Sequence, residues 1–574
     1  MTVIATAGHV DHGKSTLVLR LTGTDPDRWD EEKSRGLTID LGFANTTLPS
    51  GNDLSFIDVP GHIRFLRNML SGVGAVDGCL FVVAATEGWK PQSEEHLRIL
   101  SLLGLTRGVI ALTKIDQVDE ELFELAKLDV EEQVAGTFLE HAEIVGVSAP
   151  EALGIDELRA ALDRVVAEVG QNRVERTPRL WIDRSFAPAG AGTVVTGTLT
   201  GGRVAVSEEL EVVPAAKSVR IRGLQSHHTD LNEVEPGNRV AVNLTGIGHA
   251  DVSRGDVLVR PDEWHHSAIV DAELTVLESL SHPMTRRGAY AAYIGSGEFP
   301  AKVRVLQAAR IEPGGTGLVR LYLNRKVPLL PGDRFILRES GRDETVGGGE
   351  VLDIDPVLPA SKANPDRSIE RLVTERGWVD AAHLGRLTGE VIEPTVGNWV
   401  VDPEQLEQAK QSVLEAIGEV DALGLDVASL DDHQRAVIPL LEEVQVANGR
   451  ATIGEVADPL ADHPWVLALA AEPFAPPDAS GVDRGELREL VRRGTVIEND
   501  GVYFAKTAID KAIALLGAAL AEKPSGLTVA EIRDLLGTTR KFALPLLAQL
   551  DGTGVTRRRE DVRIAGPRMP DPSS

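Results

Sequence analysis

The segment Gly8-His9-Val10-Asp11-His12-Gly13-Lys14-Ser15 decides the fold of the N-terminal part of the chain. Largely apolar segments, Val3 to Ala7 and Thr16 to Leu21, flank it, so the pattern predicts a buried strand that turns through a glycine-rich loop into a helix. Such loops bind phosphate because backbone N–H groups converge on it, a lysine adds positive charge and a hydroxyl can ligate Mg²⁺. We therefore expect a nucleotide phosphate site with Ser15 as a Mg²⁺ ligand. The residues expected to contact the nucleotide are Asp11, His12, Gly13, Lys14, Ser15 and Thr16.

Apolar strands and amphipathic helices alternate from Met1 to about Gly170. This alternation is typical of a parallel sheet covered by helices on both faces, with ligands bound beyond the C-terminal ends of the strands. The predicted strands are 54–57, 78–85, 108–112 and 144–147, and the predicted helices are 65–70, 94–103, 121–134 and 155–169.

Two further motifs suit the γ-phosphate end of such a site. Thr38, in Arg35-Gly36-Leu37-Thr38-Ile39, offers a hydroxyl that can complete the Mg²⁺ shell while a γ-phosphate is present; the alternative is a helix cap. In Asp58-Val59-Pro60-Gly61-His62, Asp58 can hold Mg²⁺ and the Gly61 N–H can contact the γ-phosphate. His62 then lies where a residue orients the attacking water, which makes it a catalytic candidate rather than a structural histidine.

Two motifs near the later strands suit guanine. In Thr113-Lys114-Ile115-Asp116, a carboxylate at Asp116 can accept from both the N1–H and the 2-amino group of guanine, and the Lys114 stem can cover the base. Ser148-Ala149 follows the last strand and offers backbone N–H groups to the guanine O6. The sequence therefore predicts guanine specificity, with Thr113, Lys114, Asp116, Ser148 and Ala149 in the base site.

These five motifs together resemble the translational GTPases of the EF-Tu group, in which a histidine follows Asp-x-Pro-Gly. The resemblance implies GTP and GDP as ligands, with Mg²⁺. Most of that group has asparagine where this chain has Thr113, which puts one side-chain contact to the base and to the phosphate loop in doubt.

The composition fits a large protein with several domains. A chain of 574 residues exceeds one hydrophobic core, so roughly three to five domains are expected. No apolar run approaches the ~20 residues that span a bilayer, no leader for secretion precedes the first strand, and the single cysteine cannot form an internal disulfide. We expect a cytoplasmic monomer that contacts no membrane. The net charge of −28 argues against nonspecific nucleic-acid binding, so any RNA contact must be local.

From Thr177 the helical period disappears, and short runs rich in Val, Ile and Thr recur between Gly, Pro and Asp signals. This spacing predicts two small β-barrels. The resulting boundaries are 1–170 for the GTP-binding domain, 171–262 and 263–356 for the barrels, and 357–574 for the remainder. Gly192 to Thr198 resembles the second domain of EF-Tu-like factors, so the layout resembles their three-domain, tRNA-binding body.

Two segments sharpen the resemblance toward the bacterial selenocysteine-specific elongation factors, the SelB family. They are Leu180 to Phe186 and Gly237 to Asn243. In that family these segments place an aspartate and two arginines around the selenocysteyl group, which implies a pocket of Asp183, Arg184 and Arg239. A selenol ionises more readily than a serine hydroxyl, and two arginines favour its anion. The alternative is surface ion pairs on barrel strands.

Past Pro356 a linker leads into helical segments with short ribbons, an order typical of tandem winged helices. The predicted helices are 368–376, 404–417, 434–446, 485–492, 509–520, 527–537 and 540–550, and 494–504 is a predicted ribbon. The resemblance implies four units, the last at about 508–570.

The C-terminal tip reverses the charge of the chain. Between Thr538 and Arg568, seven basic residues oppose three acidic ones, a local charge of +4. Basic clusters at a helix start and on a wing can hold phosphates and reach a base of an RNA loop. They resemble the segment with which SelB proteins bind the selenocysteine insertion element (SECIS), an mRNA hairpin, which implies mRNA contacts by Arg540, Lys541, Arg557, Arg558 and Arg559.

The function that the resemblance implies is delivery of selenocysteyl-tRNA to the ribosomal A site at UGA codons by a GTPase tethered to the mRNA hairpin. Three alternatives stay open. A general EF-Tu-type or initiation factor leaves about two hundred C-terminal residues unexplained. The GTPase subunit of sulfate-activating enzymes typically has aspartate at the position of His12 and lacks a basic tail. A DNA-binding regulator would use its winged helices on duplex DNA.

Overall fold

The structure, a computed structural model, describes residues 2–26, 41–59, 76–169, 177–190, 192–226, 229–420, 424–454 and 460–570. The chain folds into two compact units, Met1–Asp402 and Pro403–Ser574. Within the described residues no helix is both long enough and apolar enough to cross a membrane. The predicted helix 65–70 lies outside these residues, as do Thr38, Gly61 and His62.

The N-terminal domain contains a six-stranded sheet in the order β2-β3-β1-β4-β5-β6. Four of its five strand pairings are parallel, as predicted, and the fifth joins the edge strand β2 antiparallel to β3. The sequence prediction missed β2 because this segment lacks a clear apolar alternation. The strands are β1 Thr2–Ala7, β2 Gly42–Thr47, β3 Asp53–Asp58, β4 Gly78–Ala84, β5 Gly108–Thr113 and β6 Ile144–Gly146.

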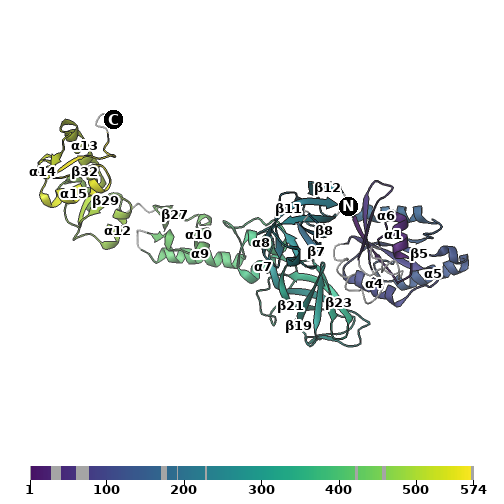
Figure 1. Cartoon of the computed structure of the whole chain (residues 1–574). Coiled ribbons are helices and arrows are strands. Elements are labelled where there is room, and N and C mark those ends of the chain that lie inside the picture. The colour runs from purple at the N-terminus through teal and green to yellow at the C-terminus, as the bar shows by residue number, and fades with distance from the viewer. Residues whose placement is uncertain are drawn as a thin grey trace. The chain divides into compact units, whose positions relative to one another are not determined.

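Helices cover both faces of this sheet, as the fully apolar central strands require (Figure 1). Alternate residues of β4 enter two separate cores: Phe81 packs with α4 and α5, whereas Leu80 packs with α1 and α6. The confirmed helices are α1 Lys14–Thr22, α4 Pro91–Leu102, α5 Glu120–Val134 and α6 Ile155–Val169. A 3₁₀ turn, η2 Ile115–Gln117, follows β5.

The second domain is a closed antiparallel barrel. Its strands pair in the order β10-β15-β7-β8-β14-β11-β12, and pairing of β10 with β11 closes the ring. β9 and β13 form a separate pair. The strands are β7 Arg179–Phe186, β8 Thr193–Thr200, β9 Val204–Ala205, β10 Glu209–Val213, β11 Lys217–Ser226, β12 Thr229–Leu231, β13 Glu233–Val234, β14 Arg239–Thr245 and β15 Val257–Val259, with η3 at His249–Asp251.

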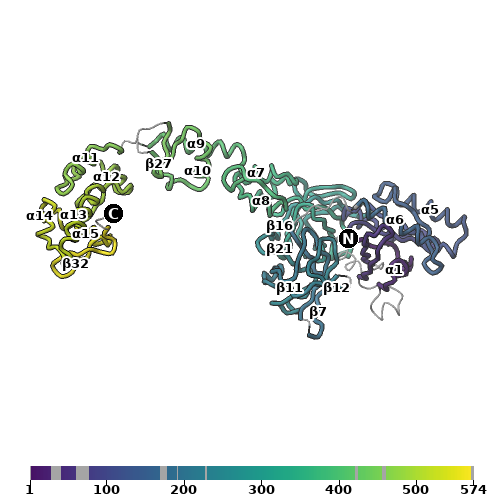
Figure 2. The backbone as a smooth tube through the Cα atoms, turned by 90° about the horizontal axis from the view of Figure 1, so that it is seen from above, coloured from purple at the N-terminus to yellow at the C-terminus, as the bar shows by residue number. Residues whose placement is uncertain are grey.

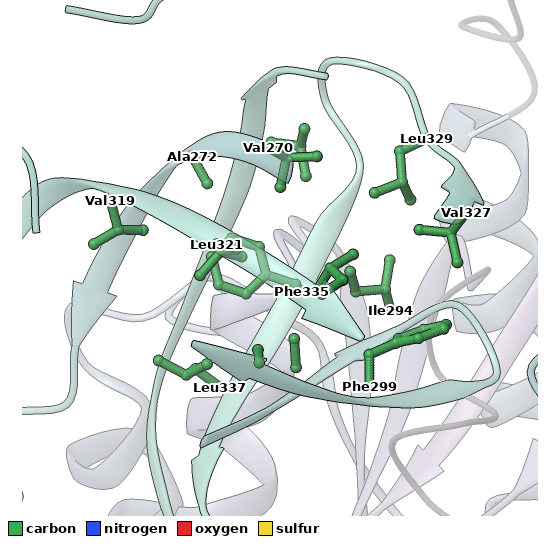
Figure 3. Packing of buried hydrophobic residues seen from close by; sticks show 14 of the residues in the cluster. Val270, Ala272, Ile294, Phe299, Val319, Leu321, Val327, Leu329, Phe335 and Leu337 are labelled. Carbon is green, nitrogen blue, oxygen red and sulfur yellow. The ribbon is translucent and has the colours of Figure 1, made fainter. Parts of the chain in front are cut away.

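The third domain is a second closed barrel, in the order β16-β21-β19-β18-β22-β23. β16 and β21 lie side by side along most of their length (Figure 2). Figure 3 shows Phe299, Leu321 and Phe335 among the apolar side chains that fill its interior. The strands are β16 His266–Val276, β17 Met284–Thr285, β18 Tyr290–Ile294, β19 Gly297–Val305, β20 Arg310–Ile311, β21 Thr316–Pro328, β22 Arg334–Glu339 and β23 Glu344–Asp353.

A small helical group joins this barrel in the first compact unit. Arg371 donates to the Asp353 carboxylate at 3.0 Å, where Asp353 is buried at the end of β23. Arg371 also pairs with Glu375, one turn later on its own helix. These bonds attach the group to the barrel. Its elements are α7 Ile369–Arg376, β24 Trp378–Asp380, α8 Ala381–Thr388 and β25 Trp399–Val401.

The second unit repeats short helices followed by small antiparallel sheets, in agreement with the predicted winged-helix region. The number of winged-helix units stays a prediction. The elements are α9 Pro403–Gly418, β26 Leu425–Asp426, η4 Val427–Ser429, α10 Asp432–Val437, η5 Ile438–Leu440, β27 Val444–Ala447, β28 Arg450–Ile453, α11 Pro464–Ala471, α12 Arg484–Arg492, β29 Val496–Asn499, β30 Val502–Ala505, α13 Lys506–Glu522, β31 Leu527–Thr528, α14 Val529–Leu536, α15 Arg540–Gly552, β32 Thr556–Arg559 and β33 Val562–Ala565.

Two predicted helices in this unit were too long. The helix predicted over 434–446 ends at Val437, because Pro439 follows and Val444 already belongs to strand β27. The helix predicted over 527–537 starts at Val529, since Thr528 is its N-cap and forms a capping box with Glu531. The predicted ribbon over 494–504 is confirmed as the hairpin of β29 and β30.

Candidate functional site

The glycine-rich loop connects β1 to α1 as predicted, and its backbone approaches the sheet closely. Gly8 has a φ of +128°, and a Cβ on it would lie 2.1 Å from the Val82 carbonyl oxygen. Gly13 is the N-cap of α1 in the left-handed region. Lys14 is the first residue of α1, and its Nζ donates to the carbonyl oxygens of Gly8 and His9 at 3.1 and 2.7 Å. The ammonium group therefore lies inside the loop, where phosphate groups would bind.

A hydroxyl and a carboxylate converge beside this loop. Ser15 Oγ donates to Asp58 Oδ2 at 2.7 Å, and Thr6 Oγ1 donates to Asp58 Oδ1 at 2.6 Å. Asp58 is fully buried at the end of β3, and the Val59 N–H donates to Thr6 Oγ1. Mg²⁺ prefers oxygen ligands of these types, so Ser15 and Asp58 fit the metal that the motif implies. Sequence reasoning missed Thr6, which fixes the carboxylate.

The first turns of α4 support the phosphate loop from the other side. The Gly8 N–H donates to His96 Nδ1 at 3.0 Å, and the Val10 N–H donates to Gln92 Oε1 at 3.1 Å. Gln92 and His96 are one helical turn apart, so both reach the loop from the same face of α4. Sequence reasoning missed both residues. Their i, i+4 spacing, which places two polar side chains on one face of a helix, was the signal that could have found them.

Burial keeps the histidines of this region neutral. It lowers the pKa of His96 to about 3, with a smaller contribution from the Lys14 ammonium group. Neutral His96 can accept from Gly8 at Nδ1 while its Nε2 carries the proton. Burial also lowers the pKa of His12 to about 4, and the neighbouring His9 lowers it further. A positive charge on either ring is therefore disfavoured in the folded protein.

The stability of this domain should fall in mild acid because of these rings. Their folded pKa values lie below the usual 6.5, so the stability is complete above pH 6.5 and is lost as the pH falls from 6.5 toward 4 and 3. Each ring costs about 1.4 kcal/mol per pH unit in that window. Hydrogen exchange of β1 and α1 measured from pH 7.5 to 5 should show this slope, and His96→Gln, which retains an acceptor, should remove roughly half of it. An unchanged slope in the variant would contradict the assignment of His96 as neutral.

The two guanine motifs come together at the ends of neighbouring strands. β5 and β6 are parallel, the Val147 N–H donates to the Leu112 carbonyl at 2.8 Å, and Ser148 pairs with Leu153. Asp116 lies exposed in η2, directly after β5. Ala149 is half-buried beside fully buried Ser148. The strands therefore place both predicted base-contacting loops at one edge of the sheet, beside the phosphate loop.

The unusual Thr113 keeps a side-chain contact to the phosphate loop. Its Oγ1 lies 2.7 Å from the His12 carbonyl oxygen, to which it can donate, so the base-binding loop remains bonded to the phosphate loop. Lys114 adopts a left-handed backbone conformation with a φ of 59°, and its Nζ donates to Glu87 Oε1 at 3.0 Å. Sequence reasoning missed Glu87.

The predicted aspartate and arginines of the second domain also come together. Arg239 Nη2 donates to Asp183 Oδ1 at 2.9 Å and to Thr196 Oγ1 at 3.2 Å, and Thr196 donates to the same carboxylate. The β7–β8 register shifts between Ile182 and Arg184, so a bulge places Asp183. The side chains of Asp183 and Arg239 are only 9% and 14% exposed, which excludes an ordinary surface ion pair.

The N-terminal domain contributes an aromatic ring to this cluster. The guanidinium carbon of Arg239 lies 3.6 Å from the centroid of the Phe43 ring, and that of Arg184 lies 5.2 Å from it. Arg184 also donates to the Leu41 carbonyl at 2.6 Å. Phe43 lies on the edge strand β2, which sequence reasoning missed together with Thr196.

The basic tip has two exposed clusters. Arg540 and Lys541 occupy the first turn of α15, where positive side chains oppose the helix dipole and no side chain caps the helix. Arg557, Arg558 and Arg559 lie exposed on β32. Strand alternation separates Arg557 and Arg559 from Arg558, which stands opposite Arg563. Arg563 instead binds the Asp551 carboxylate inside the unit, so its charge is used structurally.

Comparison with known protein families assigns each of these regions. Residues 1–168 match a family model described as the elongation factor Tu GTP-binding domain, and 192–259 match elongation factor Tu domain 2. Residues 271–357 match the β-barrel domain of the selenocysteine-specific elongation factor, and 518–565 match a winged helix of elongation factor SelB.

Whole proteins resemble the chain over nearly its full length. A selenocysteine-specific elongation factor of Desulfomicrobium baculatum is 33% identical over 98% of this chain and 99% of its own, and that of Escherichia coli K12 is 30% identical over 97% of both chains. The crystal structure of a bacterial selenocysteine-specific elongation factor, EF-Sec, matches with a TM-score of 0.72 and 26% identity, covering 98% of this chain and 100% of that one.

Proposed function

Because the chain belongs to the selenocysteine-specific elongation factor family, and its N-terminal domain is that of a translational GTPase, we propose that it delivers selenocysteyl-tRNA to the ribosomal A site at UGA codons. Its C-terminal tip would hold the selenocysteine insertion hairpin of the mRNA at the same time. The observation that carries the proposal is the partly buried cluster of Asp183, Arg184 and Arg239. The match to a SelB winged helix at the other end of the chain supports the same proposal.

The roles proposed in GTP hydrolysis rest on the sequence motifs, and for Ser15 and Asp58 also on the contact between their side chains. Ser15 and Asp58 hold Mg²⁺ together with Thr38, and Gly61 senses the γ-phosphate. His62 orients the attacking water. The remaining nucleotide contacts are assigned to Asp11, His12, Gly13, Lys14, Thr16, Thr113, Lys114, Asp116, Ser148 and Ala149. The domain boundaries proposed for the four regions are 1–170, 171–262, 263–356 and 357–574, with the last winged helix at about 508–570.

The aminoacyl pocket would recognise the charge of the selenocysteyl group. A selenol ionises far more readily than the hydroxyl of serine, and its anion is favoured by guanidinium groups that are shielded from water. Arg239 is already oriented by Asp183 and Thr196. Arg184 is oriented by the Leu41 carbonyl. A serine ester offers no negative charge to either arginine, so discrimination follows from electrostatics rather than from size.

The test is selectivity between two aminoacyl groups on one tRNA body. The full-length protein with GTP is titrated with selenocysteyl-tRNA and with seryl-tRNA of the same sequence, and with an ordinary elongator tRNA. The proposal expects tight binding of the first only, and weaker binding when GDP replaces GTP. Equal affinity for the selenocysteyl and elongator tRNAs would refute selenocysteine delivery, even if GTP hydrolysis is intact.

Removing two arginines from the wing should weaken RNA binding. Arg557→Ala together with Arg558→Ala is expected to lower the affinity for the mRNA hairpin roughly tenfold or more, since both side chains are exposed and positively charged. The slope of log affinity against log salt should also become flatter by about one per lost phosphate contact. Fluorescence anisotropy from 50 to 200 mM salt measures both. Arg488→Ala is the matched control, because it removes an exposed arginine from α12. Unchanged affinity in the double variant would place the RNA site elsewhere.

A further inference from the structure

One carboxylate lies between the phosphate loop and the base-binding loop. Glu87 follows β4, and its Oε1 accepts from Lys114 Nζ at 3.0 Å. Its other oxygen lies 4.0 Å from Nε2 of His12 in the phosphate loop. Glu87 therefore faces one residue from each of the two loops that are proposed to hold GTP.

A negative charge at this position needs a reason. GTP and GDP are polyanions, so a carboxylate beside their site opposes binding unless a cation is tied to it. The hydrogen bond from Lys114 holds the pKa of Glu87 below its usual value, so the carboxylate is ionised at neutral pH. Its charge is thus directed at the lysine whose stem is expected to cover the guanine base.

The backbone of Lys114 supports a specific task for its side chain. A non-glycine residue with a φ of 59° carries a steric cost, which is accepted where the direction of a side chain matters. Lys114 is the N-cap of η2 and follows Thr113, whose hydroxyl already binds the phosphate loop. The backbone directs Lys114 toward Glu87, and the ion pair then fixes the end of the side chain.

The side chain of His12 faces the same carboxylate. Its ring is fully buried, and Nε2 has no hydrogen-bond partner among the described residues. Glu87 Oε2 lies 4.0 Å from this nitrogen, which is too far for a direct hydrogen bond but close enough for the carboxylate charge to act on the ring. The Thr113 hydroxyl binds the His12 backbone to the base-binding loop, and the His12 side chain faces the carboxylate that binds Lys114.

We propose that Glu87 is a positioning residue for guanine nucleotides. It orients the Lys114 side chain over the purine ring, from a position at which its carboxylate also faces His12 of the phosphate loop. This inference rests on the proposed GTP site and adds to it a residue outside the five nucleotide motifs. Because Lys114 covers the ring rather than its edge, Glu87 sets how tightly a purine nucleotide is held, whereas Asp116 sets which purine is preferred.

The experiment is a double-mutant cycle in the full-length protein. Glu87→Ala, Lys114→Ala and the double variant are titrated calorimetrically with GDP and with IDP, which lacks the 2-amino group. Glu87→Ala should raise both dissociation constants by the same factor, roughly tenfold. It should have no further effect once Lys114 is alanine, because it acts through that residue. Asp116→Asn, in contrast, should change the ratio of GDP to IDP affinity.

Two further variants and the wild-type protein separate the possible outcomes. Glu143→Ala removes a carboxylate of an exposed ion pair with Arg164 in the same domain and should leave both affinities unchanged. Glu87→Gln preserves volume and replaces Glu87→Ala if that variant does not fold. Equal affinity in wild type and Glu87 variants, or an effect of equal size in the Lys114→Ala background, would overturn the inference. A wild-type protein that binds neither nucleotide would instead refute the proposed function.

Discussion

Replacing Asp58 by asparagine is expected to weaken the binding of Mg²⁺·GTP about a hundredfold, which corresponds to about 3 kcal/mol. Asparagine preserves the size of the side chain and one acceptor oxygen, so the bond from Thr6 can persist. It removes the negative charge beside Ser15 Oγ, 2.7 Å away, where the metal is proposed to bind. The loss should therefore appear mainly in the presence of Mg²⁺.

The measurement compares GTP titrations with Mg²⁺ and with EDTA. In EDTA the variant and the wild-type protein should bind GTP with similar affinity, since the phosphate loop and base loops are intact. Asp53→Asn is the matched control, because Asp53 is exposed at the start of the same strand, where it accepts a hydrogen bond from Thr47. An Asp58→Asn variant that binds Mg²⁺·GTP as tightly as wild type would remove Asp58 from the metal site.

The site residues that the sequence predicts lie in local motifs. The site residues that it misses depend on contacts between segments that are far apart in the chain. Lys14, Ser15 and Asp58 belong to local motifs, whose glycine and strand context can be read directly. His96 and Glu87 have ordinary local surroundings. They matter only because the sheet order brings α4 and the end of β4 against the phosphate loop, and tertiary proximity of that kind leaves no periodic signal.

The same distinction holds for the fold. The central strands of the N-terminal sheet are buried on both faces, so continuous apolar runs identified them. The edge strand β2 is mixed in polarity, yet its Phe43 reaches both arginines of the second domain. In the C-terminal region the apolar residues after Val437 suit a helix or a strand equally. The α-helix ends before Pro439.

The full-length family match also separates the open alternatives. A general elongation factor accounts for the N-terminal domain and the second domain, but the third-domain barrel and the C-terminal winged helix match selenocysteine-specific models. The charge distribution agrees with the RNA contact proposed for the C-terminal tip. Three exposed arginines gather on strand β32 of a chain whose net charge is −28, so an RNA contact there would be local.

Replacing Arg239 by alanine is expected to abolish most of the preference for selenocysteyl-tRNA over seryl-tRNA, a loss of roughly tenfold to a hundredfold. A charge-assisted hydrogen bond contributes about 1.5–3 kcal/mol, and shielding from water keeps Arg239 near the upper end. Arg239→Lys should recover only part of the preference, because an ammonium group keeps the charge but loses the contact of the planar guanidinium group with the Phe43 ring. Affinity for seryl-tRNA should change little, since serine presents no charge.

Competition binding with both tRNAs in the presence of GTP measures the ratio of the two affinities. Arg220→Ala, exposed on β11 of the same barrel, is the control. If Arg239→Ala lowers the affinity for both tRNAs equally, Arg239 supports the barrel or the tRNA body and does not read the selenol.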